Sequence, residues 1–190
     1  ASSPHKSMAD LIKALKENPG KVSWGGGSAG GTDHILAGLI ARAAGVDPAK
    51  INYVAFKGGG EQTPAVLGGH VTAGIAGVGE FAEQVKAGKM RALAQSGPSK
   101  IDGIPSLKEQ GIDVELGNWR GVFGAPGITT QQRDALVKLV KDATETPAWK
   151  ATLEKLGWTS VFLGGDDYGK FIDEDIKRVS AIIESLGLKK

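Results

Sequence analysis

Three glycine-rich turns, each lying between an apolar segment and a helical pattern, constrain the fold of this chain more than any other feature. The turns are Gly25–Gly31, Lys57–Gly60 and Gly77–Gly79. The segments before them, at 22–24, 51–56 and 71–76, are short and apolar, which is typical of β-strands. A strand, a turn and a helix that recur at short intervals predict a mostly parallel sheet flanked by helices. We therefore expect an α/β fold.

Helical periodicity predicts the elements around these turns. We expect a helix after Ser7, one capped by Thr32 and ended by Gly45, one that ends at Leu67 and one at 80–87. A fourth strand is predicted at 90–94.

The recurring pattern of strand, glycine turn and helix ends at Gly97. An extended segment is predicted at 114–125, helices at 130–143, 147–156 and 166–186, and a single strand at 159–163. One strand cannot bury three amphipathic helices, so the other strands of their sheet are expected elsewhere. The predicted domains are 1–120, which binds the ligand, and 121–190, the C-terminal helical part of the other domain.

Composition excludes several classes of protein. The net charge is +2 and no basic block precedes Lys189, so no nucleic-acid partner is expected. The chain has no Cys, which excludes disulfide scaffolds and cysteine nucleophiles. The most apolar stretch, 34–46, contains Arg42 and is too short to span a bilayer. The chain begins at Ala1 without a leader pattern, as a processed chain or a fragment would.

The glycine turns form a candidate site for a small anion. In a parallel sheet the turns after successive strands reach the carboxyl edge, where open α/β folds bind ligands. Glycine lets backbone amides approach a ligand, and a helix N-terminus adds unpaired N–H groups with a partial positive charge. Ser28 and Thr32 add hydroxyl groups and Lys57 adds a cation. The alternative is that these glycines only make tight turns.

Catalytic motifs compete with this interpretation. Residues 26–30 (GGSAG) match G-x-S-x-G, the nucleophile elbow of serine hydrolases, which is the alternative function. However, no His follows His70, and His34 is poorly placed to activate Ser28. The phosphate-binding Walker sequence is absent, and a dinucleotide site lacks the acidic residue expected near Lys57. No metal site, cofactor or catalytic residue is predicted.

Residues near the predicted domain boundary are further candidates for ligand binding. Trp119 and Arg120 form a pair that suits a cleft, because Arg can hold a carboxylate with two hydrogen bonds. His34 is expected to pack in the first turn of its helix. Trp149 and Trp158 are interpreted as core residues.

A further set of signals lies in residues 11–31 (LIKALKENPGKVSWGGGSAGG) with His34 after them, 54–71 (VAFKGGGEQTPAVLGGHV), 86–94 (KAGKMRALA), 104–107 (IPSL) and 119–126 (WRGVFGAP). In these segments the sequence resembles the extracytoplasmic solute-binding proteins of tripartite tricarboxylate transporters, also called Bug proteins. The resemblance covers essentially the whole chain in order, and its second segment is quite specific.

The resemblance implies a periplasmic-binding-protein-like (type II) clamp, or Venus flytrap, that captures a di- or tricarboxylate and delivers it to membrane permease subunits. It implies a periplasmic location and no enzymatic activity. In the family, one ligand carboxylate is held by the first glycine loop, the lysine–glycine loop and the turn at 76–80. With the Trp119 inference above, the expected ligand-binding residues are Gly27, Ser28, Ala29, Gly30, Gly31, Thr32, Lys57, Gly58, Gly59, Gly77, Val78 and Trp119.

Two departures from the family pattern are visible. Many members carry Asp in the third turn, where this chain has Gly77. The family's opening segment, which supplies most of the first domain's sheet, has no counterpart here. We therefore expect this chain to be the C-terminal portion of such a protein, with the N-terminal part of the first domain missing.

Overall fold

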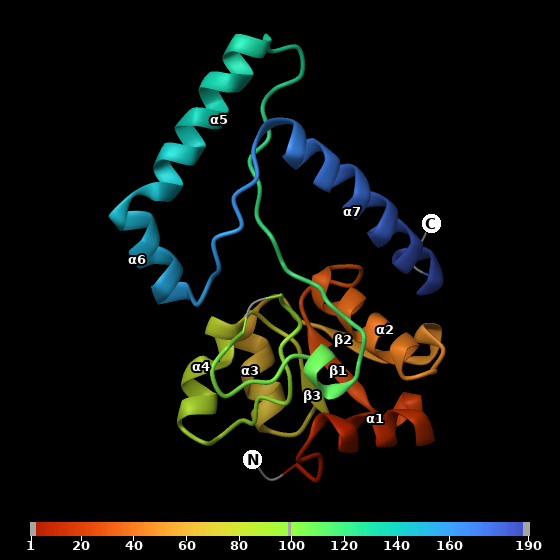
Figure 1. Cartoon of the computed structure of the whole chain (residues 1–190). Coiled ribbons are helices and arrows are strands. Elements are labelled where there is room, and N and C mark those ends of the chain that lie inside the picture. The colour runs from red at the N-terminus through yellow and green to blue at the C-terminus, as the bar shows by residue number, and fades with distance from the viewer. Residues whose placement is uncertain (1–2, 99, 188–190) are drawn as a thin grey trace. The chain divides into compact units, whose positions relative to one another are not determined.

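A computed structural model describes residues 3–98 and 100–187. The chain forms two compact units: residues 1–118 with 180–190, and residues 119–179 (Figure 1). The division into a ligand-binding domain at 1–120 and the C-terminal helical part of the other domain at 121–190 stays a prediction.

The first unit is built on a parallel sheet. Strands β1 (Ser23–Gly26), β2 (Asn52–Ala55) and β3 (Ala73–Gly74) have the order β2-β1-β3, and both pairings are parallel. Trp24 on the central strand lies opposite Tyr53 on one side and Ala73 on the other. The expected α/β fold with a parallel sheet is confirmed.

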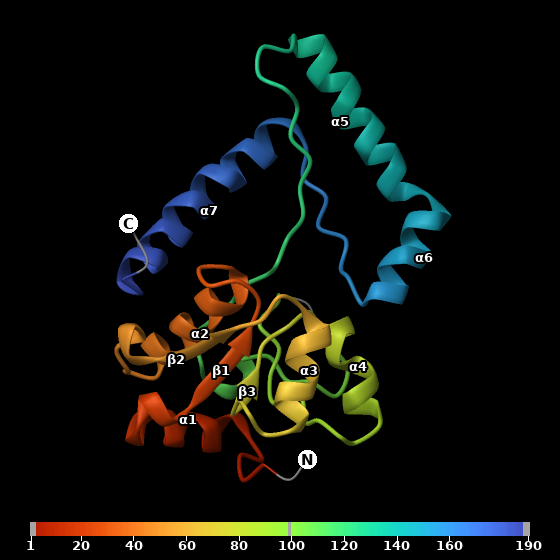
Figure 2. The ribbon, with the colours of Figure 1, turned by 180° about the vertical axis from the view of Figure 1, so that it is seen from behind.

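Helices flank this sheet, as Figures 1 and 2 show. Ser7 and Asp10 form the capping box that begins α1, because each side chain accepts a hydrogen bond from the other's backbone N–H. The helices of this unit are α1 (Met8–Glu17), α2 (Thr32–Ala43), α3 (Gly59–Leu67) and α4 (Val78–Lys86), with short 3-10 turns at Pro19–Lys21, Pro48–Lys50 and Lys108–Gln110.

The core of the first unit joins α1, α2 and the central strand. Its largest fully buried side chains are Trp24, Leu11, Leu15 and Leu107. The end of the last helix, α7 (Gly165–Ser185), also belongs here, because Ile182 and Leu186 are buried in this unit. Gly38 of α2 leaves the space that the Leu186 side chain fills.

Three predicted details are wrong. Residues 90–94 form no strand; instead Gln95 makes an isolated parallel bridge with Ser106. Residues 159–163 are extended but pair with no strand among the described residues. Alternating apolar residues favour extended backbone, but a strand also needs a partner that completes its hydrogen bonds. Thr32 is the first residue of α2, and Gly31 occupies the cap position.

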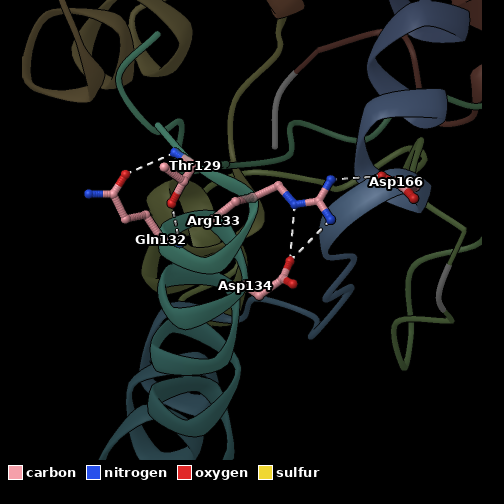
Figure 3. A network of polar contacts seen from close by, with 5 residues as sticks. All are labelled: Thr129, Gln132, Arg133, Asp134 and Asp166. Atoms are coloured by element: carbon pink, nitrogen blue, oxygen red, sulfur yellow. Dashed lines mark hydrogen bonds and ion pairs between the residues drawn. The ribbon is translucent and has the colours of Figure 1, made fainter. Parts of the chain in front are cut away.

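The second unit is a chain of helices and extended segments. It holds α5 (Thr130–Glu145), α6 (Pro147–Leu156) and the α7 residues up to Val179. Thr129 and Gln132 form the capping box that begins α5. Figure 3 shows that Arg133 joins two helices: its guanidinium binds Asp134 on α5 at 3.1 Å and Asp166 on α7 at 3.0 Å. These exposed ion pairs add little stability.

Apolar side chains of this unit are largely exposed. In residues 119–179, all of which the structure describes, no residue is buried. Val122, Phe123 and Leu139 are 69%, 67% and 64% exposed. Trp158, predicted as a core residue, is 46% exposed, whereas Trp149 is half-buried. The helices thus lack an apolar cover within their own unit, in agreement with the expectation that one strand cannot bury them.

Among the described residues, no helix combines the length and apolar character needed to cross a membrane.

Candidate functional site

The three glycine loops lie at one edge of the sheet. Residues 27–31 follow β1, residues 56–58 follow β2 and residues 75–77 follow β3, and each loop leads into a helix. Since the strands are parallel, their carboxyl ends share one edge, with the first loop between the other two. We call these three loops, with the first residues of the helices that follow them, the loop edge. It contains all the predicted ligand-binding residues except Trp119.

A carboxylate from the following helix closes each loop. The Gly27 N–H donates to Asp33 Oδ2 at 2.8 Å. The other two loops have matching bonds: the Lys57 N–H donates to Glu61 Oε2 at 3.2 Å, and the Gly77 N–H donates to Glu80 Oε1 at 3.0 Å. These three amides already have an acceptor within the protein.

Sequence reasoning did not predict Asp33 or Glu61, and Glu80 entered only through the family resemblance. The available signal was an acidic residue in the first turn of each helix, where it favours the helix N-terminus. That signal does not reveal which loop amide the carboxylate will accept.

Other donors of the loop edge are open. Among the residues that the structure describes, the N–H groups of Ser28 and Ala29 and the Ser28 hydroxyl have no hydrogen-bond partner. The same holds for the N–H groups of residues 58–60 and 78–79 and for the exposed Lys57 ammonium. Gly31 differs, because its N–H donates to the Ser28 carbonyl at 2.9 Å.

His34 and Tyr53 fix the shape of the first loop. The Gly30 N–H donates to His34 Nδ1 at 3.1 Å, and the Tyr53 hydroxyl donates to the Gly27 carbonyl at 2.9 Å. The two rings stack with centroids 4.1 Å apart. Gly30 has a φ of 80°, a conformation that side chains other than glycine rarely adopt. The loop is thereby held open at Ser28 and Ala29.

Gly26 permits this arrangement. A Cβ atom at Gly26 would lie 2.6 Å from Asp33 Cβ and closer still to the Tyr53 hydroxyl. Only glycine lets β1 approach both side chains at once.

Burial sets the electrostatics of this group. Burial raises the pKa of Asp33, with the negative charge of Glu80 acting in the same direction and the Gly27 N–H opposing them. Burial lowers the pKa of His34, which favours the neutral ring that its acceptor role requires. Burial and the Asp33 charge raise the pKa of Tyr53 and keep its hydroxyl a donor.

This geometry gives Ser28 no catalytic base. The His34 Nδ1 is occupied by the Gly30 N–H, and among the described residues the Ser28 hydroxyl has no base within hydrogen-bond distance. The nucleophile of a serine hydrolase needs such a partner.

Thr32 and Trp119 have partners of their own. The Thr32 hydroxyl donates to Asn118 Oδ1 at 3.4 Å. Trp119 lies in the second unit, where its indole N–H donates to Asp175 Oδ2 at 3.1 Å and its ring meets Tyr168 and Phe171 edge-on. A ligand contact by Trp119 stays a prediction.

Comparison with known proteins places the chain in a family. A curated UPF0065 protein from the gbd 5′ region of Cupriavidus necator is 31% identical over 193 residues, which cover all of this chain and 58% of that protein. The fold matches Rpa4515 of R. palustris, solved with adipate, at a TM-score of 0.81 and 23% identity, over 98% of this chain and 62% of that one. It also matches MatC of Rhodopseudomonas palustris, solved with bound malate, at a TM-score of 0.74 and 18% identity, over 95% of this chain and 63% of that one.

This chain thus spans about three fifths of the length of these relatives. The periplasmic-binding-protein fold expected from the resemblance is confirmed, for the part of the fold that the chain covers. The model of the tripartite tricarboxylate transporter family receptor matches residues 1–188. A receptor of this kind binds a solute and is not an enzyme, so the serine-hydrolase alternative is set aside. The chain belongs to the tripartite tricarboxylate transporter family receptors.

Proposed function

We propose that this protein binds one carboxylate of a small di- or tricarboxylate at the loop edge and supplies that acid to the permease subunits of a tripartite tricarboxylate transporter. The observation that carries the proposal is the set of open N–H groups at 28–29, 58–60 and 78–79, which share one edge of the sheet. The proposed contacts are the predicted ones: Gly27–Thr32, Lys57–Gly59, Gly77–Val78 and Trp119.

Backbone donors suit a carboxylate. Amides at helix N-termini replace the water around carboxylate oxygens, and the partial positive charge of each helix end favours the anion. The Lys57 ammonium adds a full charge at the second loop. Two structural relatives were solved with adipate and with malate, both dicarboxylates, and this supports the same class of ligand here.

The closing carboxylates refine the proposal. Because Asp33, Glu61 and Glu80 occupy the amides of Gly27, Lys57 and Gly77, the ligand is expected to use the neighbouring open donors instead. Ser28 is the best placed of these, since it offers both its N–H and its hydroxyl. Like-charge repulsion from the three carboxylates makes Lys57 important for affinity.

We further propose an extracytoplasmic location for this protein. One of the solved structures that resemble this chain is described as a periplasmic transporter. No nucleic acid and no cofactor takes part in the proposed function.

Calorimetric titration with malate, adipate and citrate tests the proposal. We expect saturable binding of at least one of these acids and none of its uncharged amide. Lys57→Gln should weaken binding by about tenfold, because removal of one ion pair of a partly desolvated anion costs about 1–2 kcal/mol. Lys50→Gln is the matched control, since Lys50 is an exposed lysine at the opposite end of β2. Absence of binding by all three acids, or equal effects of the two variants, would contradict the proposal.

A further inference from the structure

Gln62 is a buried polar residue that none of the predicted contacts includes. It lies in the first half of α3 and is 2% exposed. Its side-chain amide Nε2 donates two hydrogen bonds, to the Gly25 carbonyl at 2.9 Å and to the Ile75 carbonyl at 2.8 Å. Buried polar groups of this kind are costly unless they are paired, so the two bonds fix the side chain in place.

These two carbonyls lie at the carboxyl ends of the strands that lead into the first and third loops. Gly25 is the third residue of β1, one residue from the end of that strand, and Ile75 follows β3 directly. Gln62 itself lies on the helix that the second loop begins. One side chain therefore joins all three elements that carry the loop edge.

The hydrogen bonds of Gln62 matter because β3 pairs with β1 over a short length. β3 has two residues, and its pairing with β1 is limited to Trp24 with Ala73 and Gly25 with Gly74. Beyond the strand, the Ile75 N–H donates to the Gly25 carbonyl at 2.8 Å. That carbonyl thus accepts from both Ile75 and Gln62, while the Gln62 bond to the Ile75 carbonyl continues the connection toward the third loop.

Close packing of α3 against β3 supports the same connection. A Cβ atom at Gly74 would lie 2.8 Å from Val66 Cγ2, so α3 sits directly against β3. In that position the helix brings the Gln62 amide within reach of two carbonyls on adjacent strands. A side-chain amide nitrogen suits this role because it carries two N–H bonds. A carboxylate has no donor, and an apolar side chain would remove the hydrogen bond that each carbonyl accepts from Gln62.

We propose that Gln62 is a positioning residue that sets the three glycine loops at the spacing required for their open N–H groups to meet one carboxylate. This rests on the proposed function of the loop edge. Gln62 would not touch the ligand; it would act through the backbone of Gly25 and Ile75.

The chain offers a matched control at the other end of the same two strands. There the Ser23 N–H donates to Thr72 Oγ1 at 3.1 Å, and the Thr72 N–H donates to Ser23 Oγ at 2.9 Å. Thr72→Val removes the hydroxyl that accepts the Ser23 N–H and lies 3.2 Å from Ser23 Oγ, and so weakens the contact between β1 and β3 at their amino ends. Gln62→Met removes the side-chain bonds at the carboxyl ends and keeps the approximate volume.

The experiment compares the unaltered protein with both variants, by thermal melting, by calorimetry with malate, adipate and citrate, and by amide hydrogen exchange. We expect both variants to lower the melting temperature. Gln62→Met should also weaken carboxylate binding by about tenfold, whereas Thr72→Val should change it by less than about twofold. Gln62→Met should raise exchange of hydrogen-bonded amides in all three loops, those of Gly27, Lys57 and Ile75, which Thr72→Val leaves unchanged.

The outcomes separate this proposal from the proposed function. If the two variants bind carboxylates equally well, Gln62 supports stability alone and the positioning role is wrong. If the unaltered protein binds none of the three acids, the proposed function fails. Hydrogen exchange then still decides whether Gln62 joins the loops: exchange confined to α3 would overturn that conclusion, and exchange raised in all three loops would support it.

Discussion

His34 accepts a hydrogen bond from the Gly30 N–H at 3.1 Å, so the first residues of α2 reach back to hold the loop that precedes them. Gly30 is the residue of this loop with a positive φ. The acceptor is Nδ1, which requires that the neutral ring carry its proton on Nε2. The conformation of the proposed carboxylate site is therefore coupled to the protonation of one buried imidazole.

A pH dependence follows from this coupling. Burial lowers the pKa of His34 in the folded protein, so the unfolded chain takes up a proton on this ring first as the pH falls. The stability that neutral His34 contributes should be complete above its unfolded pKa of 6.5 and lost as the pH falls through the lower folded value. Urea unfolding at about pH 7.5 and about pH 5 measures this difference.

His34→Gln provides the comparison, because glutamine does not titrate. We expect the free energy of unfolding of this variant to fall less between the two pH values than that of the unaltered protein. Equal pH dependence of the two proteins would show that His34 does not carry the effect.

The Tyr53 hydroxyl offers a second test of the loop. Tyr53→Phe keeps the ring that stacks on His34 but removes the donor to the Gly27 carbonyl. We expect a loss of about 1 kcal/mol in the free energy of unfolding, the usual contribution of one such hydrogen bond. Hydrogen exchange at 27–31 should rise in parallel. A variant as stable as the original, with unchanged exchange, would contradict the role assigned to this bond.

Gly26 should tolerate no side chain. Gly26→Ala places a methyl group 2.6 Å from Asp33 Cβ and closer to the Tyr53 hydroxyl, so strand β1 or both side chains must move. We expect a loss of about 1–3 kcal/mol, as for other overpacked interiors.

The matched control for this substitution is Gly60→Ala. A Cβ at Gly60 meets nothing within 4 Å, and Gly60 lies in helix α3. Alanine there should stabilise the protein by about 0.5–1 kcal/mol, because glycine is unfavourable within helices. Thermal melting of the two variants should give shifts of opposite sign, and shifts of the same sign would refute the packing argument.

Much of the loop edge could be predicted because its signals are local. Glycine turns after short apolar segments and helical periodicity are properties of neighbouring residues, and together they placed β1, β2, α2, α3 and α4 within a few residues. The parallel order then followed from the recurrence of strand and helix.

The errors and omissions involve partners that are distant in sequence. Residues 90–94 have an apolar pattern typical of a strand, but the structure gives them no partner strand among the described residues. Gln62 looks like an ordinary polar residue of a helix; its acceptors are 37 and 13 positions away. The carboxylates that close the loops depend on loop conformation, which the first-turn acidic signal does not specify.

Trp119 offers a test within the second unit. Its indole N–H donates to Asp175 Oδ2, a carboxylate that also pairs with Arg178 one turn along α7, while its ring packs edge-on against Tyr168 and Phe171. Trp119→Phe keeps an aromatic ring but leaves that oxygen of Asp175 without its donor. Because bonds to charged groups contribute about 1.5–3 kcal/mol, this variant should loosen the attachment of segment 119–123 to α7.

Hydrogen exchange of residues 165–179 and 119–123 measures that change. We expect faster exchange in Trp119→Phe, whereas Trp158→Phe, which keeps an aromatic ring beneath the Arg120 guanidinium, should exchange as the original does. If both variants exchange alike, the bond between Trp119 and Asp175 does not hold this segment. Calorimetry on the same variants tests the predicted ligand contact separately: if Trp119 touches the acid, Trp119→Phe should lower the affinity more than Trp158→Phe does.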